Sequence, residues 1–337
     1  MNKLSIEHQY VNALLTIQNS GFEVTNDRTG VGTKKIFGRM LETRLDKYNF
    51  PIFKSKFVHF HSIVVELLWM LNGDDNTEYL KRHGVKIWDE WADEDGSLNG
   101  VYGKQWRAWD VDSLYKQRID RTRLELIEEF GEVPDDWSYF RPNPDQIKLP
   151  LEERDNPIFS KLIHSIDQIQ NIITTIKNNP HDRRQLVSAW NVAKVDDMNL
   201  PPCHYGFQTC VTGDKLNLMI NQRSCDMFLG VPFNVSSYAL LLTILSKLTG
   251  YTPGNLTWVG GDCHIYSNHQ EQVEQYIQRY IDKGADMEYT NGCTLKFADE
   301  VDFTNLDTFL ATTLEFPERI FLDDYKHLGS IKAPVAI

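Results

Sequence analysis

The sequence lacks three features that would decide its class at once: a regular set of cysteines, an excess of positive charge and a long apolar run. Its five cysteines, an odd number without regular spacing, favour a reduced intracellular protein over one held by disulfides. The net charge of −12 argues against an extended nucleic-acid surface, which requires clustered lysine and arginine. Because the N-terminal residues do not resemble a secretory signal, we expect a cytoplasmic protein.

The most apolar stretch, residues 238–250, predicts a buried helix and not a membrane span. It is interrupted by Lys247 and closed by Gly250, whereas a helix that crosses a bilayer needs about 20 apolar residues. Apolar side chains lie on all sides of this expected helix, which indicates a central position in the fold. A second, amphipathic helix is expected over residues 160–178, with Ser160 as its N-cap.

Strands are predicted at residues 185–191 and 216–221. In the second of these, Leu216, Leu218 and Ile220 alternate with polar neighbours, as in a strand with one buried face. Helices and strands are mixed without a regular alternation, which predicts an α+β fold.

Proline and acidic residues are concentrated between Trp109 and Pro157, which hold five of the thirteen prolines. Proline at this density excludes long regular elements, so we predict a surface insertion at about residues 110–157 with one short helix near residues 121–130. The segments on both sides of it carry motifs that belong to one site. We therefore predict a single domain over residues 1–337, although this length would also allow two domains.

The segment around Cys203 is the most informative for chemistry, because the cysteine lies between a proline pair and His204. A cysteine nucleophile reacts as the thiolate, which nearby positive charge stabilises. Arg28, the pair Arg183 and Arg184, and Arg223 could supply that charge. A lone cysteine is also common as a small buried apolar residue, so this segment alone leaves both interpretations open.

Several motifs together resemble the signature of the thymidylate synthase family. The most specific are Pro-Cys-His at residues 202–204, Gln-Arg-Ser-Cys-Asp at residues 222–226 and Phe-Leu-Gly-Val-Pro-Phe-Asn at residues 228–234. Further matching segments occur in family order at residues 26–33, 66–69, 87–92, 101–107, 182–184, 261–268 and 333–337.

The resemblance implies a fold in which a large mixed sheet packs with helices and one sheet face forms a homodimer interface. It implies reductive methylation of dUMP to dTMP, with 5,10-methylenetetrahydrofolate as the donor of both the carbon and the hydride, and dihydrofolate as the second product. Neither a metal nor a membrane nor a nucleic acid is expected to take part, and the spacing of His, Cys and Asp suggests no metal site.

The resemblance assigns the catalytic roles to six residues. Cys203 would add to C6 of the uracil ring and make C5 nucleophilic. The amide of Asn234 would match O4 and N3–H of uracil, whereas a carboxylate there would suit cytosine. Glu66 lies in an apolar stretch that would raise the pKa of its carboxyl, and it matches the general acid–base position, which acts through ordered water. The others are Tyr102, His204 and Asp226.

The nucleotide site implied by the resemblance is rich in arginine, because a phosphate dianion suits guanidinium groups. Arg183 and Arg184 would reach into the site of the neighbouring subunit, while His264 and Tyr266 would bind the 3′-hydroxyl. The full set for dUMP is Arg28, Arg183, Arg184, Gln222, Arg223, Ser224, Asp226, Asn234, His264 and Tyr266.

The folate site implied by the resemblance is apolar and aromatic, as a flat pterin requires. Lys56 would meet the glutamate tail of the folate, and residues 334–337 match a mobile tail that closes over both ligands and excludes water. The full set for the folate is Lys56, Ile87, Trp88, Trp91, Leu200, Asp226, Leu229, Gly230, Phe233, Ala336 and Ile337.

Two alternatives remain open from the sequence. A deoxyuridylate hydroxymethylase would form the same methylene intermediate but quench it with water; Trp88, Leu200 and the tail favour the water-excluding synthase. Tyr205-Gly206, after the Cys-His pair, departs from the pattern of many synthases. The second alternative is a catalytically silent relative that binds nucleotide or serves only as an interaction protein. The joint presence of Cys203, Glu66, Asn234 and the four arginines argues against it.

Overall fold

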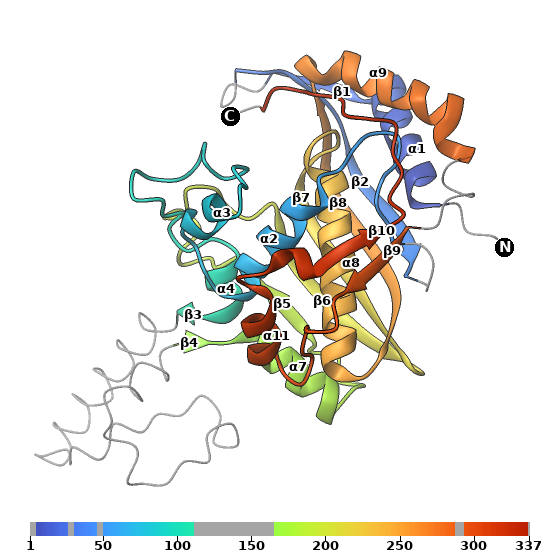
Figure 1. Cartoon of the computed structure of the whole chain (residues 1–337). Helices are drawn as coiled ribbons and strands as arrows, with labels where there is room; N and C mark the ends of the chain where they lie inside the picture. Colours follow the sequence, from blue (N-terminus) through green and yellow to red (C-terminus); the bar gives the residue numbers. More distant parts are fainter. Residues whose placement is uncertain (1–4, 26–29, 46–49, 111–164, 287–292, 336–337) are drawn as a thin grey trace, which may run out of the picture.

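The computed structural model describes residues 5–25, 30–45, 50–110, 165–286 and 293–335. Its centre is a six-stranded sheet with the order β1-β2-β8-β7-β6-β5 (Figure 1). Neighbouring strands are antiparallel except for β7 and β8, which run parallel. The strands are β1 (Phe22–Val24), β2 (Thr33–Arg44), β5 (Leu186–Ser188), β6 (His204–Thr212), β7 (Lys215–Asp226) and β8 (Thr252–Tyr266). The mixed sheet confirms the predicted α+β class.

Within the described residues, helices and two small sheets accompany the central sheet, and α1 and α8 pack against its strands (Figure 1). The helices are α1 (Ile6–Ser20), α2 (Phe60–Leu71), α3 (Glu78–Arg82), α4 (Gly103–Arg107), α7 (Gln168–Asn178), α8 (Gly230–Thr249), α9 (Gln270–Arg279) and α11 (Leu306–Thr313). Short helical turns are η3 (Ser267–His269), η4 (Tyr280–Gly284) and η5 (Pro317–Arg319). The small sheets pair β3 (Trp109–Asp110) with β4 (Ser165–Ile166), and β9 (Thr294–Phe297) with β10 (Ile320–Asp323).

Helix α8 is the central core helix that residues 238–250 predicted, but it begins earlier, at Gly230. Pro232 fits because it lies in the first turn, where a backbone N–H has no intrahelical acceptor. The helix ends before Gly250, whose φ of 82° is easy for glycine. With 20 residues α8 is long and apolar enough to cross a membrane, yet most of it is buried inside the protein.

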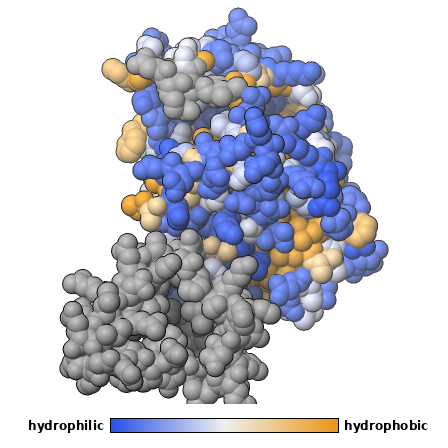
Figure 2. Space-filling view, turned by 90° about the vertical axis from the view of Figure 1, so that its left-hand side faces the viewer, coloured by the Kyte–Doolittle hydropathy of each residue, from blue (hydrophilic) through white to orange (hydrophobic). Residues whose placement is uncertain are grey.

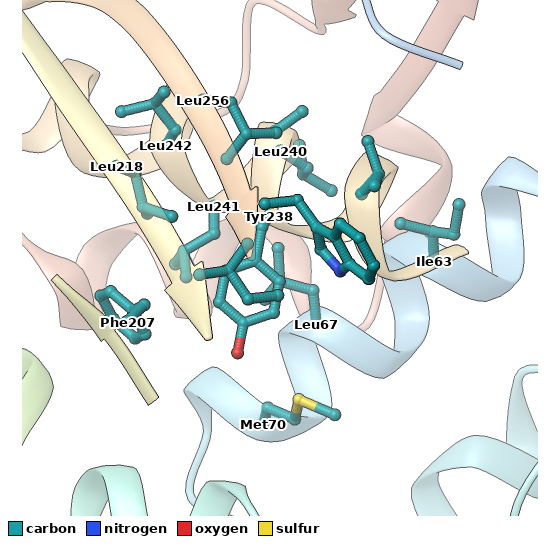
Figure 3. Close-up of a cluster of buried hydrophobic side chains, with 14 of the residues drawn as sticks. Ile63, Leu67, Met70, Phe207, Leu218, Tyr238, Leu240, Leu241, Leu242 and Leu256 are labelled. Atoms are coloured by element: carbon teal, nitrogen blue, oxygen red, sulfur yellow. The ribbon is translucent and has the colours of Figure 1, made fainter. Parts of the chain in front are cut away.

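The core joins α8 to α2 and to the sheet. Figure 3 shows Ile63, Leu67 and Met70 of α2 close to the leucines of α8, with Leu218 of β7 and Leu256 of β8 beside them. All of these labelled side chains are buried. Because both helices and the strands carry the residues of the predicted site, this packing fixes the site's framework. The face in Figure 2 is largely hydrophilic, which agrees with the charged composition.

Helix α7 starts at Gln168, so the expected start at Ser160 is wrong for the described part of this segment. The Asp167 carboxylate caps the helix by accepting from the backbone N–H of Gln170 at 2.9 Å. Ile166, before it, pairs with Trp109 as part of a strand. The isoleucines of the predicted apolar stripe that lie within α7 are buried, whereas Ile166 is exposed: the buried ones are Ile169, Ile172, Ile173 and Ile176. Ser160 itself, residues 121–130 and all of the expected insertion except Asp110 lie outside the described residues.

Candidate active site

The motif residues meet at one end of the central sheet, where β6 begins and β7 and β8 end. His204, the first residue of β6, is opposite Gln222 in the antiparallel pair. Asp226, the last residue of β7, is opposite His264 in the parallel pair. Helix α8 starts four residues after Asp226, so its first turn lies next to the same strand end. Motifs from distant parts of the sequence thus reach one place.

The loop that carries Cys203 is held by the side chain of Arg223. The guanidinium donates from Nε to the carbonyl of Pro202 at 3.0 Å and from Nη2 to that of Pro201 at 2.7 Å. The backbone N–H of Arg223 donates to the Cys203 carbonyl at 2.8 Å. Cys203 is half-buried. The arrangement fixes the peptide of the cysteine and places the guanidinium on the carbonyls of the two prolines that precede it.

Tyr102 reaches Cys203 from the other side. Its hydroxyl accepts from the Cys203 backbone N–H at 2.8 Å. The φ of Tyr102 is 29°, a left-handed conformation that costs a non-glycine residue energy and is typical of functional positions. Its ring lies over that of His204 with the centroids 4.3 Å apart. The start of α4 is therefore strained where it touches the cysteine.

His204 is buried and hydrogen-bonded through Nδ1 to the hydroxyl of Tyr238 at 3.0 Å. Burial lowers the pKa of this histidine to about 3, so the ring is neutral at physiological pH. Burial also raises the pKa of Tyr102 and of Tyr238 well above the ordinary value. The three groups form a network without charge. Tyr238, within the helix predicted from its apolar pattern, was missed as a site residue.

Glu66 is buried on α2, and Trp88 is its hydrogen-bond donor: Nε1 of the indole lies 2.8 Å from Oε1 of the carboxyl. Burial raises the pKa of Glu66 to about 7, and the hydrogen bond from Trp88 opposes this shift only in part. The predicted rise is confirmed. A carboxyl that titrates near neutral pH can accept and return a proton.

Asn234 is oriented by a chain of amide hydrogen bonds. The indole of Trp258 donates to Oε1 of Gln222 at 2.8 Å, and Nε2 of Gln222 donates to Oδ1 of Asn234 at 3.0 Å. The amide nitrogen of Asn234 is thereby left as the donor that points away from Gln222. Trp258 lies in β8 among residues that the motifs did not include, so no sequence pattern indicated its role.

The expected folate residues differ in exposure. Trp88 is buried with its ring centroid 5.9 Å from that of Trp91 and 5.8 Å from that of Tyr102. Ile87 is exposed. The half-buried members are Trp91, Leu200, Leu229, Gly230 and Phe233.

Asp226 and Lys56 are both engaged inside the protein. Oδ1 of Asp226 accepts from the backbone N–H groups of Phe228 and Leu229 at 2.9 and 3.1 Å. The Lys56 ammonium is buried, donates to the carbonyl of Phe228 and lies 3.9 Å from the centroid of the Phe228 ring. Burial lowers the pKa of Lys56 to about 8, and the negative charge of Asp226 opposes this. The role of Lys56 toward a glutamate tail stays a prediction.

The C-terminal tail is anchored by a residue that the sequence did not single out. Nε2 of His269 donates to the carbonyl of Pro334 at 2.7 Å, and the His269 ring is fully buried beside Phe228 and Tyr266. Ala336 and Ile337 lie outside the described residues. The described part of the tail therefore ends close to the motif residues of β7 and β8.

The predicted arginines do not all meet within one chain. Arg183 and Arg184 are exposed before β5, at the sheet edge opposite β1, and Arg184 pairs with Asp182 at 2.7 Å. Arg28 lies outside the described residues. Ser224 is half-buried near the end of β7. Within the described residues, Arg223 is thus the arginine placed beside Cys203.

His264 and Tyr266, at the end of β8, are neighbours with ring centroids 5.0 Å apart and an edge-on geometry. His264 is buried. No group of three or more His, Cys, Asp or Glu side chains is placed to hold a metal within the described ranges. All five cysteines are free thiols.

The model of the thymidylate synthase family matches residues 8–337, nearly the whole chain. The chain belongs to the thymidylate synthase family. Members of this family are enzymes of dTMP biosynthesis that bind dUMP and a folate, and they use methylenetetrahydrofolate as the co-substrate of a methyltransferase-type reaction. The resemblance that the motifs indicated is thereby confirmed for the family.

Proposed function

We propose that the protein is a thymidylate synthase that converts dUMP into dTMP, with the folate as donor of both the one-carbon unit and the hydride. The observation that carries this proposal is the common location of Cys203, Glu66 and Asn234 at one end of the sheet, each held by a defined hydrogen bond of its side chain or backbone. A family member that only binds nucleotide would not need this arrangement.

Cys203 would act as the nucleophile. Its thiolate forms a bond to C6 of uracil, and the electrons of the C5–C6 double bond move to give an enolate at O4. The Asn234 amide nitrogen, which Gln222 leaves free to donate, would stabilise that developing charge. After the carbon is attached at C5, loss of the C5 proton and departure of the folate nitrogen would give an exocyclic methylene. A hydride from the released tetrahydrofolate would reduce this methylene to the methyl group and leave dihydrofolate, and elimination of the thiolate would then restore the C5–C6 double bond and return Cys203 unchanged.

Glu66 would handle the protons of these steps. Its raised pKa of about 7 lets it release and regain a proton near neutral pH. The neutral ring of His204 and the hydroxyl of Tyr102 add groups that relay a hydrogen bond without carrying charge. Uncharged neighbours of this kind suit an enolate that must not be protonated before it reacts with the folate carbon.

Exclusion of water separates the synthase from its alternative, the hydroxymethylase. Trp88, packed between Trp91 and Tyr102, and the tail held by His269 support closure over the intermediate. The deciding assay is the mass of the product from dUMP and methylenetetrahydrofolate. We expect dTMP and dihydrofolate; a hydroxymethyl nucleotide with tetrahydrofolate would overturn the synthase and favour the alternative.

The nucleophile is tested by Cys203→Ala, with Cys210→Ala as the matched control because Cys210 is an exposed thiol on the adjacent strand β6. Removal of the nucleophile should lower turnover by roughly 10⁴-fold or more, while dUMP still binds. The control should keep its turnover. Appreciable turnover by Cys203→Ala would overturn the assignment.

The protein would act as a homodimer with one domain per chain and two shared sites. Large apolar side chains are exposed on strands of the sheet, as expected of a surface that a second copy covers: Phe22, Phe37, Met40, Leu186 and Tyr205. Arg183 and Arg184 are exposed and away from Cys203 of their own chain, which supports their contribution to the neighbouring site.

A further inference from the structure

Lys35, Asp262 and His264 form a chain of polar contacts between β2 and β8. Lys35 is opposite His264 in this antiparallel pair. Its ammonium lies 2.5 Å from Oδ2 of Asp262, and Oδ1 of Asp262 lies 3.1 Å from Nδ1 of His264. The side chains of Lys35 and Asp262 are about one-third exposed, whereas that of His264 is 9% exposed. The motif comparison assigned roles to neither Lys35 nor Asp262.

This geometry fixes the proton of a neutral His264 ring. Nδ1 faces two acceptors, the carboxylate Oδ1 at 3.1 Å and the backbone carbonyl of Asp262 at 3.2 Å. A neutral imidazole donates from one nitrogen only, so the proton resides on Nδ1 and Nε2 is left as an acceptor. The hydrogen bond from His264, followed by the Lys35 ammonium, lowers the pKa of Asp262 against the effect of its partial burial.

We propose that Lys35 and Asp262 are positioning residues that hold His264 as a hydrogen-bond acceptor, so that the site selects nucleotides whose 3′-hydroxyl can donate to Nε2. The inference rests on the proposed function, in which dUMP is the substrate and His264 faces its sugar. It adds a direction to that contact: the nucleotide donates and the protein accepts.

The neighbouring Lys34 shows what an ordinary surface pair on the same strand looks like. Its ammonium is 3.9 Å from a carboxylate oxygen of Glu23, whose side chain is 83% exposed. Such a solvated pair contributes little. The ion pair between Lys35 and Asp262 is shorter, and Asp262 also contacts the buried ring of His264. Loss of Lys35 should therefore weaken the binding of the nucleotide. Lys34→Met is therefore the matched control for Lys35→Met.

The test measures the binding of dUMP and of 2′,3′-dideoxyuridine 5′-monophosphate to the full chain by calorimetry. In Asp262→Asn, the amide oxygen should turn to the Lys35 ammonium, which places the amide NH₂ against Nδ1. The tautomer with the proton on Nδ1 then keeps only the backbone carbonyl of residue 262 as its acceptor, so the tautomer with the proton on Nε2 gains population. We expect dUMP to bind about tenfold more weakly, with the dideoxynucleotide changed less than twofold. Lys35→Met should weaken the binding of dUMP by about threefold and leave that of the dideoxynucleotide unchanged. Lys35→Arg and Lys34→Met should leave both affinities unchanged.

The double variant provides the sharpest readout. Without Lys35, the amide in Asp262→Asn can rotate and offer its oxygen to Nδ1, so Lys35→Met combined with Asp262→Asn should bind dUMP more tightly than Asp262→Asn alone. A merely structural role would give additive losses on both nucleotides, and that result overturns the inference. If the wild-type chain does not bind dUMP, the proposed function fails as well; binding of dUMP with equal losses for both nucleotides overturns only the tautomer inference.

Discussion

Trp88 donates its indole N–H to the carboxyl of Glu66 at 2.8 Å, and Glu66 lies in a part of α2 that is otherwise apolar. The hydrogen bond fixes the direction of the carboxyl but does not compensate for the loss of water around it, because burial still raises the pKa of Glu66 to about 7. The same tryptophan packs against Trp91 and Tyr102. One side chain thus links the acid–base group to the apolar wall of the site.

The raised pKa of Glu66 predicts a pH-dependent cost to stability. The folded state binds the proton more tightly than the unfolded state, whose carboxyl titrates near the ordinary 4.5. The contribution of Glu66 to the free energy of unfolding is therefore largest at low pH, falls as the pH rises from 4.5 to about 7, and is level above that. At most roughly 3 kcal/mol is lost over this window.

Glu66→Gln should remove this component. Urea unfolding of the wild type and the variant at pH 5 and at pH 8 measures it: relative to the wild type, the variant should gain stability at the higher pH, while its turnover falls about 10²-fold or more for want of the acid–base group. Glu90→Gln, at an exposed position near Trp88, is the control and should change neither quantity. A pH-independent difference between Glu66→Gln and the wild type would contradict the raised pKa.

The motifs predicted where most of the candidate site lies, because short contiguous segments of the chain carry several of its residues. Residues 222–226 and 228–234 lie at the end of β7 and the start of α8, as a contiguous site element should. Contacts that depend on the register between strands could not be predicted from the sequence. Lys35 and Asp262 are 227 residues apart, and only the pairing of β2 with β8 brings them together.

The start of α7 was misplaced for a related reason. An isoleucine at helical spacing, Ile166, extended the apolar pattern, but it pairs with Trp109 in a small sheet, and the Asp167 carboxylate starts the helix after it. Periodicity alone does not distinguish a helical residue from a strand residue that precedes a cap. Trp258 was missed because a buried tryptophan in a strand has the same sequence signature whether or not its N–H orients a site residue.

Shared sites predict complementation between two inactive variants. One subunit carries Cys203→Ala, and the other carries Arg183→Ala with Arg184→Ala. Each homodimer should be inactive or nearly so, but equal mixing after unfolding and reassembly should restore about a quarter of the wild-type turnover, because half of the dimers are mixed and each has one complete site. No recovery in a mixture shown to contain mixed dimers, or full activity of the arginine variant alone, would contradict the shared site.

The Trp258–Gln222–Asn234 chain predicts a specificity defect without direct contact to substrate. Trp258→Phe removes the donor to Oε1 of Gln222, so both amides can turn and Asn234 can present either group to the pyrimidine. We expect a loss of about 1–2 kcal/mol in stability, a higher KM for dUMP and weaker discrimination against dCMP.

Trp69→Phe is the control for this prediction. Trp69 is equally buried and its indole donates to the carbonyl of Asn76 at 2.9 Å, outside the Gln222 network. Trp69→Phe should lower the stability by a similar amount and leave unchanged both the KM for dUMP and the discrimination against dCMP. Equal discrimination in both variants would mean that Asn234 keeps its orientation without Trp258.

The hydrogen bond from His269 to Pro334 predicts that the C-terminal tail is held at its base by a buried ring. His269→Phe keeps the ring packing beside Phe228 and Tyr266 but removes the Nε2 donor at 2.7 Å from the Pro334 carbonyl. Because closure would exclude water from the methylene intermediate, we expect dUMP binding within twofold of wild type, turnover about tenfold lower, and a new fraction of hydroxymethyl product detected by mass spectrometry.

Deletion of Ile337 should produce the same pattern, and the control His181→Phe, at an exposed position, should not. Loss of dUMP affinity in step with turnover would show instead that His269 supports the nucleotide pocket and not the closure of the tail.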